Sequence, residues 1–179
     1  MCRFLCMLSM AAYFIFTPIY ASDAFETESD LRFRHLTVRD GLSLNTVVKI
    51  VQDHSGFIWI ATNDGLNRYD GYDFVVYKRQ QNNDKSLRSN YISALHVDEM
   101  GVLWVGTRAG LHRYNEKTDD FSHFPLESGD VIQDLVFSIM DDSENDQIWI
   151  ATLGSGIARF NRKSHQFSRY LHDKNDPQS

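Results

Sequence analysis

One pattern recurs three times along this 179-residue chain, and it constrains the fold more than any other feature. Its tryptophans, at positions 59, 104 and 149, are 45 residues apart both times. An aspartate precedes each tryptophan and a glycine follows it. The residues that carry the repeat are Asp53, Trp59, Gly65, Asp98, Trp104, Gly110, Asp142, Trp149 and Gly156. A period of this length is typical of architectures in which similar units pack side by side.

Each repeat has the composition of four short strands. In the first repeat, β-branched residues at 47–51 are followed by an Asp-x-x-Gly turn and an apolar run at 57–62. The tripeptide at 63–65 predicts a hairpin turn, because its glycine takes positive φ without steric cost. An aromatic pair, Phe74 and Tyr77, marks the fourth strand. Four strands in about 45 residues is the size of a propeller blade. The sequence therefore predicts an all-β fold, a β-propeller with three four-stranded blades.

The tryptophan of each repeat has a very small residue two positions after it. These pairs are Trp59 and Ala61, Trp104 and Gly106, and Trp149 and Ala151. Alternation along a strand places both members of a pair on one face of the sheet. A large residue beside a small one suits sheets that interlock, so we expect the tryptophans to pack between neighbouring blades. The alternative is a tryptophan that stays exposed for stacking on a sugar ring.

The repeats divide the chain into segments. We expect a signal peptide at 1–21, a lead-in at 22–32, a lone outer strand at 33–36, blades at 45–77, 90–124 and 134–170, and a truncated inter-blade loop at 171–179. The lone strand matches the fourth-strand signature and could complete a blade shared by both chain ends. Three blades do not close a ring, since propellers have four to eight. The sequence therefore predicts an incomplete ring from a longer protein, whose open apolar face would promote association.

The first 21 residues resemble a secretory signal. Arg3 precedes a largely apolar run at 4–16, and the small residue Ala21 stands at a plausible cleavage point. The run is shorter than the roughly 20 residues of a membrane span, although an uncleaved anchor is the alternative. Both cysteines of the chain lie in this segment, so the exported form would have no thiol chemistry. We expect a periplasmic location.

Charge and motifs exclude several classes of function. Arg3 is the only charged residue of the predicted signal peptide. Once that segment is removed, the chain has 17 basic and 24 acidic residues, which disfavours nucleic acid or an anionic membrane as partner. No nucleophile elbow, phosphate loop or zinc motif occurs, so we expect no catalytic residue, cofactor or metal. Asp142, Glu144 and Asp146 alternate as in a calcium loop, but Gln147 stands where glycine belongs, which favours a solvated turn.

Histidines offer no metal site in the sequence. The seven histidines are scattered, and none pairs with another at the spacing of metal ligands. His35 and His123 share a repeat position on the outer strand. A solvated side chain is the favoured interpretation there, and metal ligation is the alternative.

Candidate ligand contacts lie at the tips of the hairpins. In an antiparallel blade, the turns between the second and third strands share one face with the loops that join blades. The tip residues differ between repeats while the surrounding pattern is constant, and binding is usually placed on such loops. The candidates are Asn63, Asp64, Arg108 and Ser155. Arg108 is the first choice, because its fork of donors suits an anionic or hydroxyl-rich ligand. The alternative is that all four are plain turn residues.

The repeat resembles a known family. Gly-Phe-Ile-Trp-Ile-Ala-Thr-Asn-Asp-Gly-Leu-Asn-Arg-Tyr-Asp-Gly at 56–71 resembles the two-component regulator propeller repeat, and 101–115 and 148–161 are similar. The segment 33–43 also resembles the usual opening of such proteins. The pattern differs from the WD repeat, since no Trp-Asp ends the third strand. The resemblance covers residues 33–179.

This resemblance implies a role in signal transduction. Such propellers form the extracytoplasmic sensor of bacterial regulators and precede a β-sandwich, a membrane span, and a cytoplasmic histidine kinase or diguanylate cyclase. We expect no enzyme activity in the residues present, since the phosphorelay or cyclase output would belong to the parent protein. The implied partner is an extracellular small molecule, such as an oligosaccharide or peptide, and the implied parent is membrane-anchored and dimeric.

Three alternative functions remain at this point. The chain could be the input domain of a diguanylate cyclase, or a free-standing propeller used as an interaction scaffold. A propeller enzyme such as a lyase would need a cluster of histidine or acidic residues at the central channel, and none is evident. A membrane span followed by a kinase or cyclase in the parent protein would favour the sensor.

Overall fold

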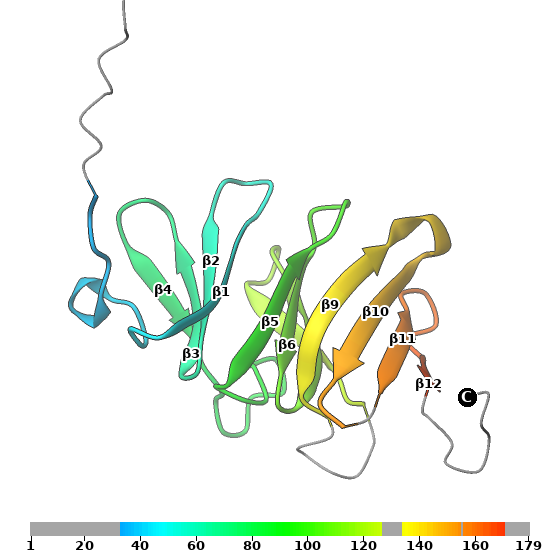
Figure 1. Ribbon diagram of the computed structural model, residues 1–179. Helices are drawn as coiled ribbons and strands as arrows, with labels where there is room; N and C mark the ends of the chain where they lie inside the picture. Colours follow the sequence, from blue (N-terminus) through cyan, green and yellow to red (C-terminus); the bar gives the residue numbers. More distant parts are fainter. Residues whose placement is uncertain (1–32, 127–133, 155, 171–179) are drawn as a thin grey trace, which may run out of the picture. The chain divides into compact units, whose positions relative to one another are not determined.

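The computed structural model describes residues 33–126, 134–154 and 156–170. From His35 onward the chain forms one compact unit, in which the described strands make three four-stranded antiparallel sheets (Figure 1). Blade 1 contains β1 (Val47–Gln52), β2 (Ile58–Thr62), β3 (Gly65–Tyr69) and β4 (Phe74–Tyr77). Blade 2 contains β5 (Ile92–Val97), β6 (Leu103–Thr107), β7 (Gly110–Asn115) and β8 (Asp120–Phe124). Blade 3 contains β9 (Val136–Asp142), β10 (Gln147–Thr152), β11 (Ile157–Asn161) and β12 (Phe167–Tyr170).

The strands of every blade pair in the order of the sequence, and β1, β5 and β9 lie side by side as the first strands (Figure 1). Each first strand also has a register shift, a β-bulge or irregularity, next to its first residue. The pairs that mark this point are Val47 with Thr62, Ile92 with Thr107, and Val136 with Thr152. The prediction of an all-β propeller with three four-stranded blades and an incomplete ring is confirmed.

A hydrogen bond ties the first turn of each blade to its tryptophan. The indole Nε1 donates to the aspartate Oδ2, over 2.6 Å for Trp59 and Asp53, 2.8 Å for Trp104 and Asp98, and 3.3 Å for Trp149 and Asp142. The other oxygen of Asp98 accepts the backbone N–H groups of Met100 and Val102 at 3.1 and 2.8 Å. The aspartate therefore closes the turn, as expected from its composition, and also holds the tryptophan ring.

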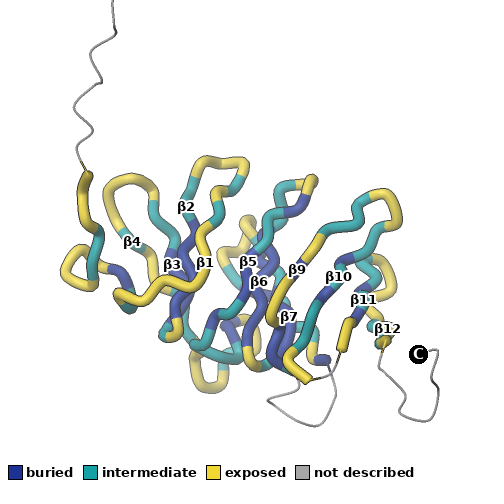
Figure 2. The backbone as a smooth tube through the Cα atoms, in the orientation of Figure 1, coloured by how far each residue is buried: buried dark blue, intermediate teal, exposed yellow. Residues whose placement is uncertain are grey.

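Neighbouring blades pack through opposite faces. We call the side of a blade that bears the tryptophan its tryptophan face, and the other side its aliphatic face. At the first junction, the tryptophan face of blade 1 contacts the aliphatic face of blade 2, and their buried residues include Trp59, Ala61, Leu66, Leu95, Leu103 and Val105. At the second junction, between blades 2 and 3, the equivalent residues include Trp104, Leu111, Ile139, Ile148, Ile150 and Phe160. Figure 2 shows these buried strands at the centre of the stack.

Glycine is required at one point of the second junction. A Cβ added to Gly106 would lie 2.6 Å from Cγ1 of Val136, which is closer than real side chains approach. Trp104, two residues earlier, is buried in the same cluster as Val136. The small residue beside the tryptophan therefore makes room for the first residue of the next blade, which explains the large–small pairing in the sequence.

The predicted lone outer strand at 33–36 is wrong. Residues 33–37 adopt no strand, and Phe33 is 85% exposed. A strand needs a neighbour for its backbone groups, and none of the described strands pairs with this segment. Thr37 instead caps the short 3-10 helix η1 (Val38–Asp40), whose Asp40 side chain accepts the Thr37 backbone N–H.

Several expected segments lie outside the described residues. These are the signal peptide 1–21, the lead-in 22–32 and the loop 171–179. The strands of the three blades fall within 45–77, 90–124 and 134–170. Within the described ranges, no helix has the length and apolar character needed to cross a bilayer.

Candidate functional site

Hairpin tips and inter-blade loops meet on one face of the stack, which we call the loop face. Asp64 in the β2–β3 turn accepts hydrogen bonds from Lys78 Nζ at 2.7 Å and from Asn90 Nδ2 at 3.3 Å. Lys78 and Asn90 lie at the two ends of the loop between blades 1 and 2. In blade 3, the backbone N–H of Leu153 in the turn donates to the carbonyl of Leu135 at 3.0 Å. These contacts place tips and loops together, at the lower edge of Figure 1.

Arg108 is exposed in the β6–β7 turn, on this loop face. Its guanidinium lies over the Tyr91 ring, with Cζ 4.2 Å from the ring centroid. Within the described part of the chain, no carboxylate lies within ion-pair distance of it. The ring therefore holds the guanidinium plane in place without using its N–H donors, which leaves them available to a ligand.

The structure brings two of the four predicted tip residues to one loop. Asp64 contacts Asn90 and Arg108 contacts Tyr91, and these two loop residues are consecutive. Asp64 is already paired with Lys78, so it positions the loop rather than offering a free carboxylate. Asn63 is exposed in the same turn as Asp64 but has no assigned contact to the loop. Ser155 lies outside the described residues.

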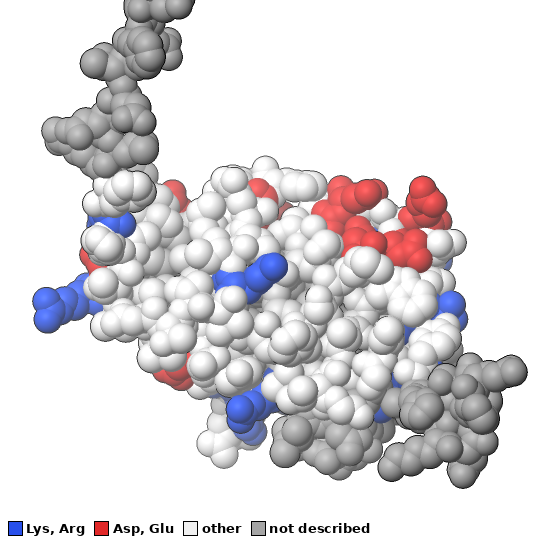
Figure 3. Space-filling model, viewed as in Figure 1, with Lys and Arg blue, Asp and Glu red and all other residues white. Residues whose placement is uncertain are grey.

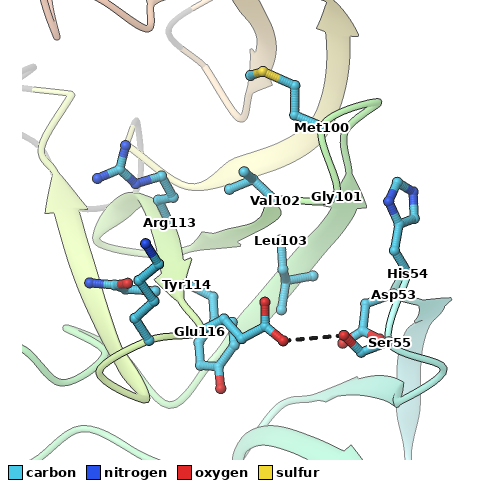
Figure 4. Close-up of a pocket in the computed structure, with 12 residues that line it drawn as sticks. Asp53, His54, Ser55, Met100, Gly101, Val102, Leu103, Arg113, Tyr114 and Glu116 are labelled. Carbon is cyan, nitrogen blue, oxygen red and sulfur yellow. Dashed lines mark hydrogen bonds between the residues drawn. The ribbon is translucent and has the colours of Figure 1, made fainter.

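A cleft of about 460 Å³ opens on the other end of blades 1 and 2 (Figure 4). The turn after β1 and the turns after β5 and β7 form it, and its polar groups include those of His54, Ser55, Arg113, Glu116 and Lys117. Ser55 Oγ donates to Glu116 Oε1 at 3.2 Å across the first junction. Both the volume and the mixture of donors and acceptors suit a small polar ligand.

None of the predicted ligand contacts lines this cleft. Its side chains come from turns of two different blades, and residues far apart in the sequence meet there only after the blades pack. Glycine is favoured at position 101 by its φ of 81°, and an added Cβ would also lie 2.7 Å from Nδ1 of the exposed His54, which would then have to move. The repeat pattern gives no signal for this cleft, since Asn115 and Lys117 recur as Asn161 and Lys163 in the third repeat.

Buried His112 has a structural role that the sequence did not reveal. Its Nε2 accepts the backbone N–H of Arg88, in the loop before β5, at 3.1 Å. Asn67 holds the same position in β3, and its Oδ1 accepts the backbone N–H of Ser43 at 2.8 Å. Burial lowers the pKa of His112 to about 3, with His123 and Arg88 adding repulsion, so the imidazole stays neutral and can accept this bond.

The prediction that the His123 side chain is solvated is wrong. His123 pairs with His112 across β7 and β8, and the ring centroids are 4.7 Å apart. His123 is partly buried, its Nε2 contacts the carbonyl of Ala109, and burial lowers its pKa. A neighbouring large side chain on the same sheet face shields it, which the spacing of histidines could not indicate.

We expect His112→Asn to remove part of the acid sensitivity of the fold. The unfolded chain binds a proton at His112 near its usual pKa of 6.5, and the folded chain only near pH 3, so stability falls as pH drops through this window. Asparagine accepts the same backbone bond in blade 1 and does not titrate. Between about pH 7.5 and about pH 5.5, the wild type should lose about 1 kcal/mol more than the variant in urea unfolding.

The exposed His54 provides the control for this experiment. His54→Asn changes an exposed imidazole instead of a buried one, and its unfolding is measured in parallel at the same pH values. Identical pH profiles for His112→Asn and the wild type would contradict the assignment of His112 as a neutral acceptor.

Acidic side chains gather over the turns after β5 and β9 (Figure 3). Two of the three acidic residues that alternate as in a calcium loop bind other side chains. Asp142 accepts hydrogen bonds from Asn145 and Trp149, and Asp146 pairs with Lys163. These bonds lower the pKa of both carboxyl groups. Across the described ranges, no group of three or more histidine, cysteine or acidic side chains is arranged to hold a metal ion.

Comparisons with known proteins agree with the architecture. Residues 41–64 and 86–109 match the family model described as two-component regulator propeller. Histidine kinase P4 of Formosa agariphila is 39% identical over 59 residues, which are 33% of this chain and 4% of the kinase. The two segments that match the family model contain Trp59 and Trp104.

Solved structures extend the similarity to the fold. The extracellular domain of the hybrid two-component system BT3049 from B. thetaiotaomicron is 32% identical, with a TM-score of 0.69, and the match covers 76% of this chain and 20% of that one. The extracellular domain of BT4673 from the same organism is 25% identical, with a TM-score of 0.54, and the match covers 65% of this chain and 16% of that one. This chain thus spans a fifth or less of each. The chain therefore carries segments that match the two-component regulator propeller model, within a fold similar to that of the extracellular domains of these two-component systems.

Proposed function

We propose that this chain is an extracytoplasmic, ligand-sensing propeller segment of a bacterial two-component protein with a histidine kinase output. The observation that carries the proposal is its 32% identity to the extracellular domain of a hybrid two-component system, over 76% of this chain. The similarity to histidine kinase P4 supports the same output. The apolar segment after Arg3 supports export, to the periplasm of a bacterium with two membranes.

The loop face is the proposed site of ligand contact. The Arg108 guanidinium already lies over the Tyr91 ring in the absence of a ligand, and a side chain held in this way loses less conformational freedom on binding. A guanidinium with available donors suits a carboxylate, a sulfate or vicinal hydroxyl groups. We therefore propose a small extracellular ligand with such groups, an oligosaccharide or a peptide, and no role for nucleic acid. The parent protein is proposed to be membrane-anchored and dimeric.

Arg108→Ala should weaken the response of the full-length parent protein. The substitution removes the donors but leaves the buried frame of β6 and β7 unchanged, so export and melting temperature should stay at wild-type values. We expect the half-maximal ligand concentration to rise roughly tenfold, as for loss of one charge-assisted hydrogen-bond pair. The measurement is a dose–response curve with an output-gene reporter and candidate oligosaccharides and peptides.

Lys117→Ala is the matched control, because Lys117 lines the cleft on the opposite end of the blades. It should leave the dose–response curve unchanged. The reverse result, with Lys117→Ala weakened and Arg108→Ala normal, would move the ligand to the cleft and overturn the loop-face assignment. A parent protein whose output does not respond to any change in this propeller would overturn the sensor function itself.

A further inference from the structure

The loop between β4 and β5 returns close to its own start, and one side chain closes it. Asn90 Oδ1 accepts the backbone N–H of Arg79 at 2.7 Å, and the two residues stand 11 positions apart, near the two ends of the loop. Asn90 Nδ2 also donates to Asp64 Oδ1 at 3.3 Å. One carboxamide therefore ties the ends of the loop to each other and to the hairpin tip of blade 1. We call Asn90 with these two hydrogen bonds the loop clasp.

The loop clasp lies directly beside the ring that supports Arg108. Asn90 precedes Tyr91 in the chain, and both are partly buried, whereas Arg108 is exposed. The backbone N–H of Tyr91 donates to Ser89 Oγ at 3.1 Å, so this residue is bonded within the loop as well. The end of the loop is thus fixed at consecutive residues, and the last of them carries the ring under the guanidinium.

Blade 3 has a backbone bond at the position where blade 2 has this ring. In blade 3, the N–H of Leu153 in the tip donates to the carbonyl of Leu135, the residue before β9, at 3.0 Å. Arg108 and Tyr91 hold these two positions in blade 2, and no backbone hydrogen bond joins them in the described part of the chain. The contact between guanidinium and ring links the two positions instead. The place of the ring therefore depends on the loop that carries it.

The partners of the loop clasp call for a carboxamide at position 90. The group must accept from the Arg79 backbone and donate to the Asp64 carboxylate, and asparagine has both an acceptor and a donor. An aspartate would still accept the first bond but would place a second carboxylate against Asp64. Asp64 is held in turn by Lys78 Nζ at 2.7 Å.

We propose that Asn90 is a positioning residue of the loop-face site. By closing the loop against the tip of blade 1, it holds the Tyr91 ring under Arg108 before a ligand is bound. This role rests on the ligand site proposed above for the loop face, and it gives Asn90 no contact with the ligand itself. The contribution of Asn90 is to reduce the conformational freedom that Arg108 loses on binding.

NMR of the Arg108 side chain measures its placement without any ligand. The Tyr91 ring shifts signals of groups that lie over it upfield, and Tyr91→Leu gives the reference without a ring. In the 179-residue chain, Asn90→Ala should move the Arg108 signals toward those of Tyr91→Leu. Asn90→Asp should act in the same way. Asn90→Asp combined with Asp64→Asn should restore the wild-type signals, because donor and acceptor have only been exchanged.

The response of the full-length parent protein measures the effect on ligand binding. Asn90→Ala should raise the half-maximal ligand concentration roughly threefold, as expected when one more side chain must be immobilised on binding, and leave the maximal response unchanged. In the Arg108→Ala background, Asn90→Ala should have no further effect, because it acts through Arg108. The matched control is Gln81→Ala, an exposed amide in the same loop, which should change neither the signals nor the response.

Each arm of the experiment can overturn a different step. Arg108 signals that stay at wild-type values in Asn90→Ala would show that the loop clasp does not hold the ring. Shifted signals with an unchanged half-maximal concentration, where Arg108→Ala weakens the response, would separate the clasp from ligand binding. A further loss in the Arg108→Ala background would make Asn90 a ligand contact or a frame residue instead. If Arg108→Ala itself has no effect, the loop-face site fails, and the NMR arm alone decides whether Asn90 positions Tyr91.

Discussion

Replacing Trp104 with alanine should lower the free energy of unfolding by about 3–5 kcal/mol, the usual loss when a buried aromatic side chain is deleted. The indole is 2% exposed and packs in the second junction, near Phe124 and Phe160. Its removal also leaves Asp98 Oδ2 without the 2.8 Å bond from the indole N–H. Urea unfolding followed by circular dichroism measures the effect.

Trp149→Ala is the control, because Trp149 holds the same position on a face that no other described blade covers. Its side chain is only partly buried and its bond to Asp142 is longer, at 3.3 Å. We expect less than half the loss found for Trp104 when both variants are measured under the same conditions. Equal losses at the two positions would show that packing between blades does not determine the role of the tryptophan.

Arg162→Ala should cost about 3–5 kcal/mol, because it leaves two buried carboxylates without their cation. The guanidinium of Arg162 pairs with Asp98 at 3.3 Å and also with Asp141. The exposed fraction is 9% for the Arg162 side chain and 0% for that of Asp98. The loss should lie toward the lower end of the range, since Asp98 still accepts bonds from Trp104 and from the backbone of its own turn.

Lys163→Ala tests whether this effect depends on burial. Lys163 neighbours Arg162 and pairs with Asp146, but its side chain is 79% exposed. Exposed pairs contribute about 0–1 kcal/mol, so this variant should unfold within about 1 kcal/mol of the wild type. In the double variant Arg162→Ala with Asp141→Asn, part of the lost stability should return, because one unpaired charge is removed. Equal losses for Arg162→Ala and Lys163→Ala would refute the role of the buried pairs.

Much of the fold was predictable because the repeat carries it three times. The large–small pair at Trp104 and Gly106 predicted interlocking sheets, and the close approach of Val136 explains why a small residue stands there. The prediction failed at 33–36, where an aromatic pattern resembled a fourth strand. A short strand depends on its partner, and local pattern does not show whether a partner is present.

Of the candidate functional sites, only the loop face was predictable from the sequence, because the topology of the strands alone places its residues together. Antiparallel strands place the hairpin tips and inter-blade loops on one face, and the contacts of Asp64 and Arg108 agree with that. The cleft near His54 and the pair of Arg162 with Asp98 depend on which side chains meet across a junction. Such meetings join residues about one repeat or more apart, and each junction uses different residue types, so a single sequence gives no periodic signal for them.

The two junctions share their apolar pattern but differ in their polar contacts. Arg68, Tyr114 and Asp119 connect blades 1 and 2, whereas Arg162 connects blade 3 to Asp98 in blade 2. A transposed blade 3 would keep Asp141, which lies in its own strand β9, but would separate Arg162 from Asp98 of blade 2. Duplication can therefore supply new blades for such a ring, but once these contacts have diverged, recombination can no longer shuffle them freely.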